Sequence, residues 1–260
     1  MIIESTSIQG TMHTQYDVKN QDAVLTFQTA GYTGVVACDG VSLTSNWTFS
    51  HSEIAAAIVS KAAVSYLENQ LNEPEADQPI CDTIRDAFLF SLAVLKEALD
   101  KMEIPFFDCQ TTLIVALYKE GHLWAGIAGD GGILFQTENH NVGTLITRLK
   151  SSSSVYPIGD TQEWRFFEGG SDADPIKQFL VATDGVFDQL IIPYEGQLGG
   201  NYELIEKFFT ISQVPASKRN EWLHELVDSL PGHDDKTIAI AIDQDLKSGE
   251  KSNSQAKDEA

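Results

Sequence analysis

Five aspartates lie at the ends of apolar runs, where carboxylates from different strands can meet at one edge of a sheet. Asp39, Asp130 and Asp184 each follow such a run and are each followed by glycine, whereas Asp22 and Asp234 each precede one. Carboxylates packed together without a cation repel one another, and this raises their pKa values. Hard divalent ions such as Mg²⁺ and Mn²⁺ relieve the repulsion, because they prefer carboxylate, carbonyl and water oxygens. The pattern therefore favours a divalent metal cluster.

A single Asp-Gly pair has a simpler interpretation, because it is the commonest signal for a short hairpin. Asp130-Gly131 is followed by the apolar run Ile133-Leu134-Phe135 and fits a plain hairpin turn. Taken alone, each of the three pairs is better explained as a turn. Their recurrence, together with Asp22 and Asp234, shifts the balance toward metal binding.

Other chemistries find less support in the sequence. There is no G-x-S-x-G motif, so a serine nucleophile of the hydrolase type has no basis. An aspartyl phosphotransferase of the D-x-D type is also disfavoured, because Ala37 stands two residues before Asp39 and Val41 two residues after it.

The elements that must position these aspartates follow from the apolar periodicity. Period-2 runs predict strands, and period-3.6 runs predict helices. Strands are expected at residues 23–27, 34–38, 112–117, 123–127, 132–136, 164–168, 179–183 and 237–242. Helices are expected from Ser52 onward and over residues 84–99, 202–209 and 218–230. Because strands and helices are segregated rather than alternating, the order favours an α+β fold with antiparallel sheets.

The overall charge narrows the range of partners. The 260 residues include 17 Lys+Arg and 38 Asp+Glu, which gives a formal net charge of −21. Such a surface repels the phosphates of nucleic acids and anionic membrane leaflets, and we expect neither as a partner. It attracts basic partners and divalent cations.

The cysteines and the ends of the chain indicate a cytoplasmic protein. Cys38, Cys81 and Cys109 form neither a disulfide framework nor a zinc pattern. The N-terminal residues lack the basic and apolar regions of a signal peptide, and no apolar run is long enough to span a bilayer. We expect one domain over residues 1–245 and a disordered polar tail over residues 246–260.

The motifs, taken in order, resemble the protein phosphatase 2C family, the metal-dependent Ser/Thr phosphatases. The resemblance covers nearly all of residues 8–243, and the opening G-x-x-H before Q-D-A is similar to a divergent bacterial branch. It rests on Asn20-Gln21-Asp22-Ala23, Val36-Ala37-Cys38-Asp39-Gly40, Thr111-Thr112-Leu113, Ala128-Gly129-Asp130-Gly131, Val181-Ala182-Thr183-Asp184-Gly185 and His233-Asp234-Asp235-Lys236-Thr237. Each motif alone is weak, but the ordered set is specific.

The resemblance implies a four-layer α-β-β-α sandwich, with two central antiparallel sheets flanked by helices. It also implies hydrolysis of phosphoserine and phosphothreonine esters by a water held between two Mn²⁺ or Mg²⁺ ions, without a phosphoenzyme. Asp39 would bridge the two ions, and the Gly40 carbonyl would hold one of them. The other ion would be held by Asp184 and Asp234. Asp22 would act on the Asp39 side through water.

A third, weaker ion is also implied by the resemblance. It would lie between Asp130 and Asp184. A phosphorylated protein would be the substrate, in opposition to a Ser/Thr kinase, and we expect a monomer.

Several positions depart from the family pattern. Asp17 stands where many members carry a phosphate-gripping arginine, and a carboxylate cannot replace that bidentate clamp. His13 is the candidate substitute as a catalytic and substrate-binding residue, because a protonated imidazole can donate to phosphate or to the leaving oxygen. A histidine beside a strand is also commonly structural. Val41 replaces a family histidine, and Asp235 replaces the usual asparagine.

These departures keep a second hypothesis open, that of a catalytically weak regulator that uses the fold to bind a partner. The intact Asp39, Asp184 and Asp234 favour the enzyme. Gly132 also replaces the arginine of the family's G-D-S-R element. Two loop segments, residues 42–49 and 151–159, are either flaps beside the active site or ordinary linkers.

Overall fold

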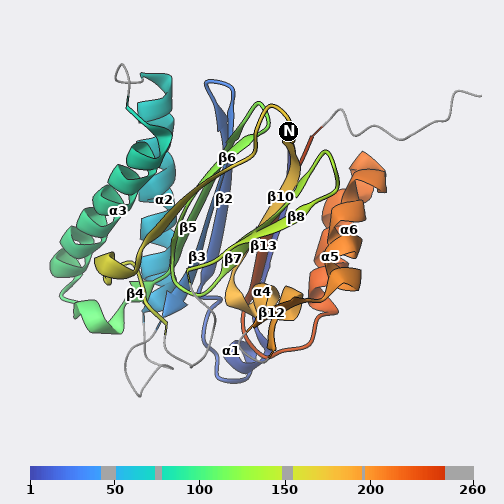
Figure 1. The fold of residues 1–260 in the computed structure, drawn as a ribbon. Coiled ribbons are helices and arrows are strands. Elements are labelled where there is room, and N and C mark those ends of the chain that lie inside the picture. The colour runs from blue at the N-terminus through green and yellow to red at the C-terminus, as the bar shows by residue number, and fades with distance from the viewer. Residues whose placement is uncertain (42–50, 74–77, 148–154, 195–196, 244–260) are drawn as a thin grey trace, which may run out of the picture.

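The fold is taken from a computed structural model, which describes residues 1–41, 51–73, 78–147, 155–194 and 197–243 (Figure 1). The loop at residues 42–49, the serine run at residues 151–154 and the expected tail at residues 246–260 lie outside the described residues. Predictions about those three segments therefore stay predictions.

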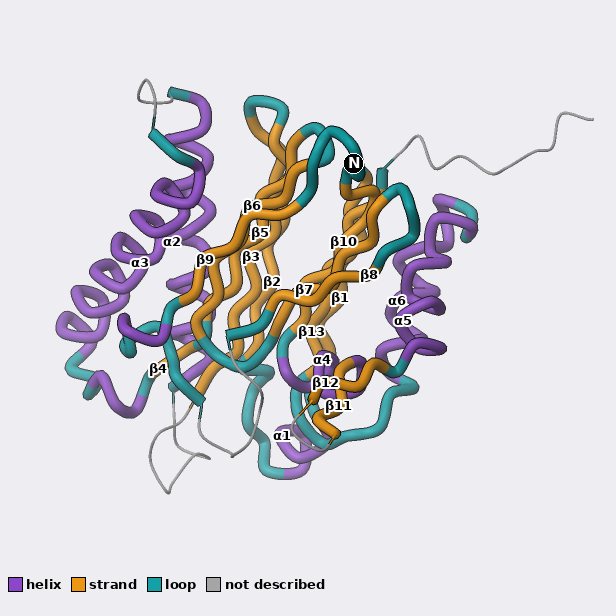
Figure 2. Tube along the Cα trace, viewed as in Figure 1, coloured by secondary structure: helices purple, strands orange, loops and turns teal. Residues whose placement is uncertain are grey.

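Two antiparallel sheets pack face to face and form the middle of the molecule (Figures 1 and 2). The first sheet has the strand order β1-β13-β10-β7-β8. Its strands are β1 (Ile2–Ile8), β7 (Gly132–Thr137), β8 (Val142–Leu145), β10 (Ile176–Ala182) and β13 (Lys236–Ile242). The second sheet has the order β2-β3-β5-β6-β9, and β4 pairs with β3 beside this path. Its strands are β2 (Asp22–Thr29), β3 (Tyr32–Val41), β4 (Gln110–Thr111), β5 (Leu113–Lys119), β6 (His122–Ala128) and β9 (Arg165–Gly169).

Helices cover the outer face of each sheet (Figure 1). The long helices α2 (Ser52–Asn72) and α3 (Ile80–Met102) lie on the second sheet. On the first sheet lie α5 (Tyr202–Phe209) and α6 (Arg219–Asp228), while the shorter α1 (Thr11–Gln15) and α4 (Asp184–Leu190) lie at one end of the sandwich. A small hairpin, β11 (Ile191–Tyr194) and β12 (Gln197–Gly200), follows α4. The predicted α+β sandwich of four layers is confirmed.

Strand β3 shows why the central strands are apolar throughout. Val35 and Ala37 point into the apolar cluster between the two sheets, whereas Val36 and Cys38 point into the cluster under α2 and α3. All four side chains are fully buried. A strand buried on both faces loses the polar alternation of a surface strand, so its sequence is a continuous apolar run.

Some elements differ from the expectation. Strand β1 and the short helices α1 and α4 were not predicted from the sequence. β1 has four consecutive polar residues between its isoleucines, so it lacks the alternation that predicts a strand, and the two helices are short. The turn at Asp130-Gly131 does not close a hairpin. It carries the chain from β6 in one sheet to β7 in the other.

Candidate metal centre

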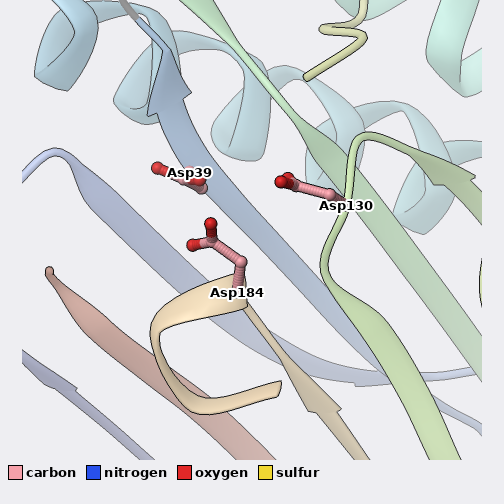
Figure 3. Close-up of side chains that lie close together, drawn as sticks. All are labelled: Asp39, Asp130 and Asp184. Carbon is pink, nitrogen blue, oxygen red and sulfur yellow. The ribbon is translucent and has the colours of Figure 1, made fainter. Parts of the chain in front are cut away.

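Three of the predicted aspartates converge at the end of the sandwich where α4 lies. Asp39, Asp130 and Asp184 each offer a carboxylate oxygen, and these three oxygens lie within 4.8 Å of one another. Figure 3 shows the three side chains directed into one common space from strand β3, from the crossing between β6 and β7, and from the start of α4. The structure thus brings together side chains that are far apart in the sequence.

Asp39 is held by the end of β4 and by the residue between β4 and β5. Its amide donates to Thr112 Oγ1 at 2.9 Å, and the Thr112 amide donates back to the Asp39 carbonyl at 2.8 Å. Thr111 Oγ1 donates to the same carbonyl at 2.9 Å. On the other side, Asp39 is paired in register with Asp22 of β2. These contacts fix the backbone of Asp39 from both neighbouring strands.

Asp130 is placed by two glycines that have no room for a side chain. Gly129 has φ +119°, and a Cβ there would lie 2.5 Å from Thr112 Cβ. A Cβ on Gly131 would lie 2.6 Å from the Ala182 carbonyl oxygen. The connection between β6 and β7 therefore packs closely on both sheets. This close packing places Asp130 beside Asp39 and Asp184.

Gly132 has a further packing role. A Cβ at this position would lie 2.3 Å from Cζ of Phe187, which is buried on α4. The ring occupies the space that a side chain at residue 132 would need. Because Phe187 is one turn after Asp184, this contact sets how closely α4 approaches the crossing that carries Asp130.

Asp184 follows β10 and begins α4, after the buried Thr183. Thr183 Oγ1 donates to Asp22 Oδ2 at 2.8 Å and accepts from the Thr237 amide at 3.2 Å. A Cβ on Gly185 would lie 1.9 Å from the Asp235 carbonyl oxygen, so only glycine allows α4 to pack this closely on the residues before β13. One hydroxyl thus connects the two sheets at the site.

Asp22 and Asp234 lie outside the set of three oxygens defined for the described residues. Asp22 lies beside the set, as its register with Asp39 and its bond from Thr183 show. Asp234 lies near the start of α4, since a Cβ on Gly185 would be 3.6 Å from Asp234 Cβ. Desolvation and then the charge of Asp184 raise the pKa of the Asp234 carboxyl. Asp22, at the start of β2, and Asp234, just before β13, thus border the cluster.

Gly40 is fixed from the other side. Its amide donates to the Gln21 carbonyl at 3.0 Å, and a Cβ on Gly40 would lie 2.7 Å from Ser52 Cβ at the start of α2.

His13 lies on α1 with 8% of its surface exposed. Its Nδ1 is 2.8 Å from Asp235 Oδ2.

The electrostatics of the cluster fit a cation. Desolvation raises the pKa of Asp39 well above its ordinary value, and the charges of Asp184, Asp22, Asp234 and Asp130 raise it further. Desolvation and then the charge of Asp235 raise the pKa of Asp22 to about 8. Both shifts arise because several carboxylates share one partly dry site. A divalent ion would remove this penalty, and the oxygen-only donor set suits Mn²⁺ or Mg²⁺.

Comparison with known proteins identifies the family of this chain. The sequence matches the family profile described as protein phosphatase 2C over residues 9–228. The chain belongs to the protein phosphatase 2C family. A comparison with curated protein sequences gives no significant match.

Solved phosphatase 2C structures share the fold at low sequence identity. The catalytic domain of the serine/threonine phosphatase PstP, determined with two manganese ions, is 16% identical, with a TM-score of 0.63 and coverage of 93% of this chain and 97% of that one. PstP/Ppp of Mycobacterium tuberculosis is 15% identical, with a TM-score of 0.62 and coverage of 93% and 98%. PppA of Pseudomonas aeruginosa is 13% identical, with a TM-score of 0.61 and coverage of 92% and 96%.

Two other features bear on function. A cavity of about 350 Å³ lies away from the aspartates, between the β2–β3 turn and the facing ends of α2 and α3. Among the described residues that line it, Lys119 carries the charge, and its ammonium lies over the Tyr32 ring. None of the described helices is long and apolar enough to cross a membrane.

Sequence reasoning missed the residues that support the aspartates. Thr112 and Thr183 bind Asp39 and Asp22 directly, and Asp235 faces His13 rather than the three-oxygen set. Both threonines belong to motifs that carry the family resemblance, and both stand beside strand ends. Their supporting role could therefore have been predicted from the sequence. The partners of Asp235 were not predictable, because they lie more than 200 residues away.

Proposed function

We propose that the chain is a metal-dependent phosphatase that hydrolyses phosphoserine and phosphothreonine esters in proteins. The observation that supports this most directly is the convergence of Asp39, Asp130 and Asp184 within 4.8 Å in a phosphatase 2C fold. Carboxylates placed this closely repel one another unless a cation lies between them.

The proposal assigns two Mn²⁺ or Mg²⁺ ions to the carboxylates, with a third and weaker ion at Asp130 and Asp184. Asp39 would bridge the first two, the Gly40 carbonyl would serve one, and Asp184 and Asp234 would serve the other. Asp22 would act through water. When bound, such ions supply an activated water at neutral pH and neutralise phosphate charge.

His13 is the proposed contact for the substrate phosphate or the leaving oxygen. Because Nδ1 lies against Asp235, this contact would have to come from Nε2. His13→Ala should then lower kcat/KM without abolishing Mn²⁺ binding, and unchanged kinetics would exclude the contact.

The test of the proposed function is Mn²⁺-dependent hydrolysis of para-nitrophenyl phosphate and of phosphoserine, phosphothreonine and phosphotyrosine peptides. We expect activity with Mn²⁺, loss in EDTA, and loss in Asp184→Asn. The matched control is Asp100→Asn, which removes one exposed charge from α3. Activity that survives Asp184→Asn would exclude this mechanism.

The second candidate is a catalytically weak regulator that binds a partner. Asp17 favours it, because this exposed carboxylate stands where many family members carry the phosphate-gripping arginine. A wild-type protein that binds Mn²⁺ but turns over none of these substrates would favour the regulator.

The biological setting is also a proposal. We propose a monomer that acts in the cytoplasm on phosphoproteins, opposite a Ser/Thr kinase, with one catalytic domain over residues 1–245. The free thiols of Cys38, Cys81 and Cys109 support a reducing compartment. The formal net charge of −21 supports the absence of nucleic-acid and membrane partners.

A further inference from the structure

Asp235 is a buried carboxylate that is not a member of the three-oxygen set. It stands immediately before β13, and 2% of its surface is exposed. Its Oδ1 accepts from the Gly10 amide at 2.6 Å, and its Oδ2 accepts from the Gln21 amide at 2.6 Å. His13 Nδ1 lies 2.8 Å from Oδ2. Both oxygens are therefore used by the segment that joins β1 to β2.

This environment compensates the charge of Asp235. A buried carboxylate is costly unless it is paired and hydrogen-bonded. Here two main-chain amides and one imidazole surround it. The hydrogen bond to Asp235 raises the pKa of His13.

The joining segment lies directly on the residues before β13. The Met12 amide donates to the His233 carbonyl at 3.1 Å, and Thr11 Oγ1 is 2.9 Å from His233 Nδ1. A Cβ on Gly10 would lie 2.4 Å from the His233 carbonyl oxygen, so the two backbones meet without space for a side chain. The start of the segment is therefore docked onto the residues that include Asp234.

The end of the same segment reaches the other sheet. The Gln21 amide donates to Asp235, and the Gln21 carbonyl accepts from the Gly40 amide at 3.0 Å. Asp22 follows directly and pairs in register with Asp39. One residue, Gln21, therefore connects Asp235, just before β13 of the first sheet, to β3 of the second sheet, at the side chains proposed to bind metal.

We propose that Asp235, together with His13, is a positioning residue that holds Asp22 and the Asp39-Gly40 backbone in register with Asp234. The metal-binding part of this inference rests on the proposed function, whereas the docking of residues 10–21 does not.

Asparagine cannot reproduce the arrangement. It has one acceptor oxygen and one NH₂ group, whereas three donors surround Asp235. If the amide oxygen faces Gln21 and His13, the NH₂ group faces the Gly10 amide. If it faces Gly10, the NH₂ group faces the Gln21 amide. Either way, a donor meets a donor in a buried site.

The first experiment measures Mn²⁺ binding by calorimetry in the full chain. Residues that orient metal ligands typically contribute 10- to 100-fold in metal affinity. We therefore expect Asp235→Asn to bind Mn²⁺ about 10- to 100-fold more weakly, with unchanged circular dichroism. The control is Asp100→Asn, which should bind as the wild type does. An affinity for Asp235→Asn within about twofold of the wild type would overturn the proposal.

The second experiment measures residue-resolved amide hydrogen exchange in EDTA, where no metal contributes. The Gly10 and Gln21 amides should be protected in the wild type and should exchange faster in Asp235→Asn. Wild-type amides that exchange as fast as an exposed loop would overturn the proposal, even if the variant does not fold. If the wild type binds no Mn²⁺ but both amides are protected, the proposed function fails and the docking by Asp235 stands.

Discussion

Asp22 carries a desolvated carboxylate beside Asp39, and its replacement by asparagine should make the metal-free protein more stable. The carboxyl is bound by Thr183 and lies beside Asp39 in register. Desolvation and then the charge of Asp235 raise its pKa from 3.8 to about 8, against the hydrogen bonds from Thr183 and Thr237, which lower it. Asparagine keeps an oxygen for the Thr183 hydroxyl but carries no charge.

The sign of the effect follows from proton binding. Because the pKa of Asp22 is higher in the folded chain than in the unfolded chain, the folded chain keeps this proton between pH 4 and pH 8 while the unfolded chain loses it. The free energy of unfolding therefore falls as the pH rises through this window, and above about pH 8 the full penalty is present. Each pKa unit corresponds to about 1.4 kcal/mol, so a shift of about four units sets an upper value of about 6 kcal/mol.

The assay is urea unfolding in EDTA at pH 5, 7 and 9, for the wild type and Asp22→Asn. We expect a gain of several kcal/mol for the variant at pH 9, a small difference at pH 5, and a shallower pH dependence throughout. Asp39 keeps its own raised pKa, so some dependence should remain. Adding Mn²⁺ should stabilise the wild type more than the variant. A wild type and variant with the same pH slope would refute the reasoning.

Three further substitutions test how the cluster is positioned. Gly132→Ala should lower the unfolding free energy by about 1–3 kcal/mol through overpacking on Phe187, and Phe187→Leu should restore part of it in the double variant, as measured by thermal unfolding. Thr112→Val should cost about 1–3 kcal/mol, because it removes the acceptor for the buried Asp39 amide, and it should also weaken Mn²⁺ binding. Gly185→Ala should lower the unfolding free energy and the Mn²⁺ affinity more than Gly132→Ala does. Its Cβ would meet a backbone carbonyl, whereas the Cβ at residue 132 would meet a ring that can move.

These outcomes can each fail in a specific way. Additive effects of Gly132→Ala and Phe187→Leu would show that the ring does not compete for the space at residue 132. A Thr112→Val variant with wild-type stability would mean that the Asp39 amide finds another acceptor. For Gly185→Ala, a full-strength Mn²⁺ affinity would show that the close approach of α4 does not matter for the site.

The fold was predictable where the burial of a strand or helix gives its sequence a regular pattern of apolar residues. The apolar runs inside β3, β5, β10 and β13 are long because these strands are buried by the other sheet on one face and by helices on the other. Helix α2 was expected from Ser52 and begins there. Strand β1 was missed because its residues are mostly half-buried, so its pattern is diluted by polar positions.

The candidate site was predictable in part. The local sequence proposed Asp39, Asp130 and Asp184 as ligands, and the structure brings these three together. For Asp130, local chemistry alone left a hairpin open, because an Asp-Gly pair looks the same in a turn and in a crossing between sheets. The partner sheet of β7 settles this, and pairing between sheets depends on contacts across the whole domain.

The sequence by itself determined the layered α+β class, the acidic and oxygen-only character of the site, and the aspartates at strand ends. These properties depend on residue type and on periodicity along a few consecutive positions. Tertiary structure alone decided that Asp235 faces Gly10, His13 and Gln21 while Asp39 faces Asp184 and Asp130. All of these residues carry similar local signals, and what separates them is which distant backbone amides and carboxylates the packed sheets bring within a few ångströms.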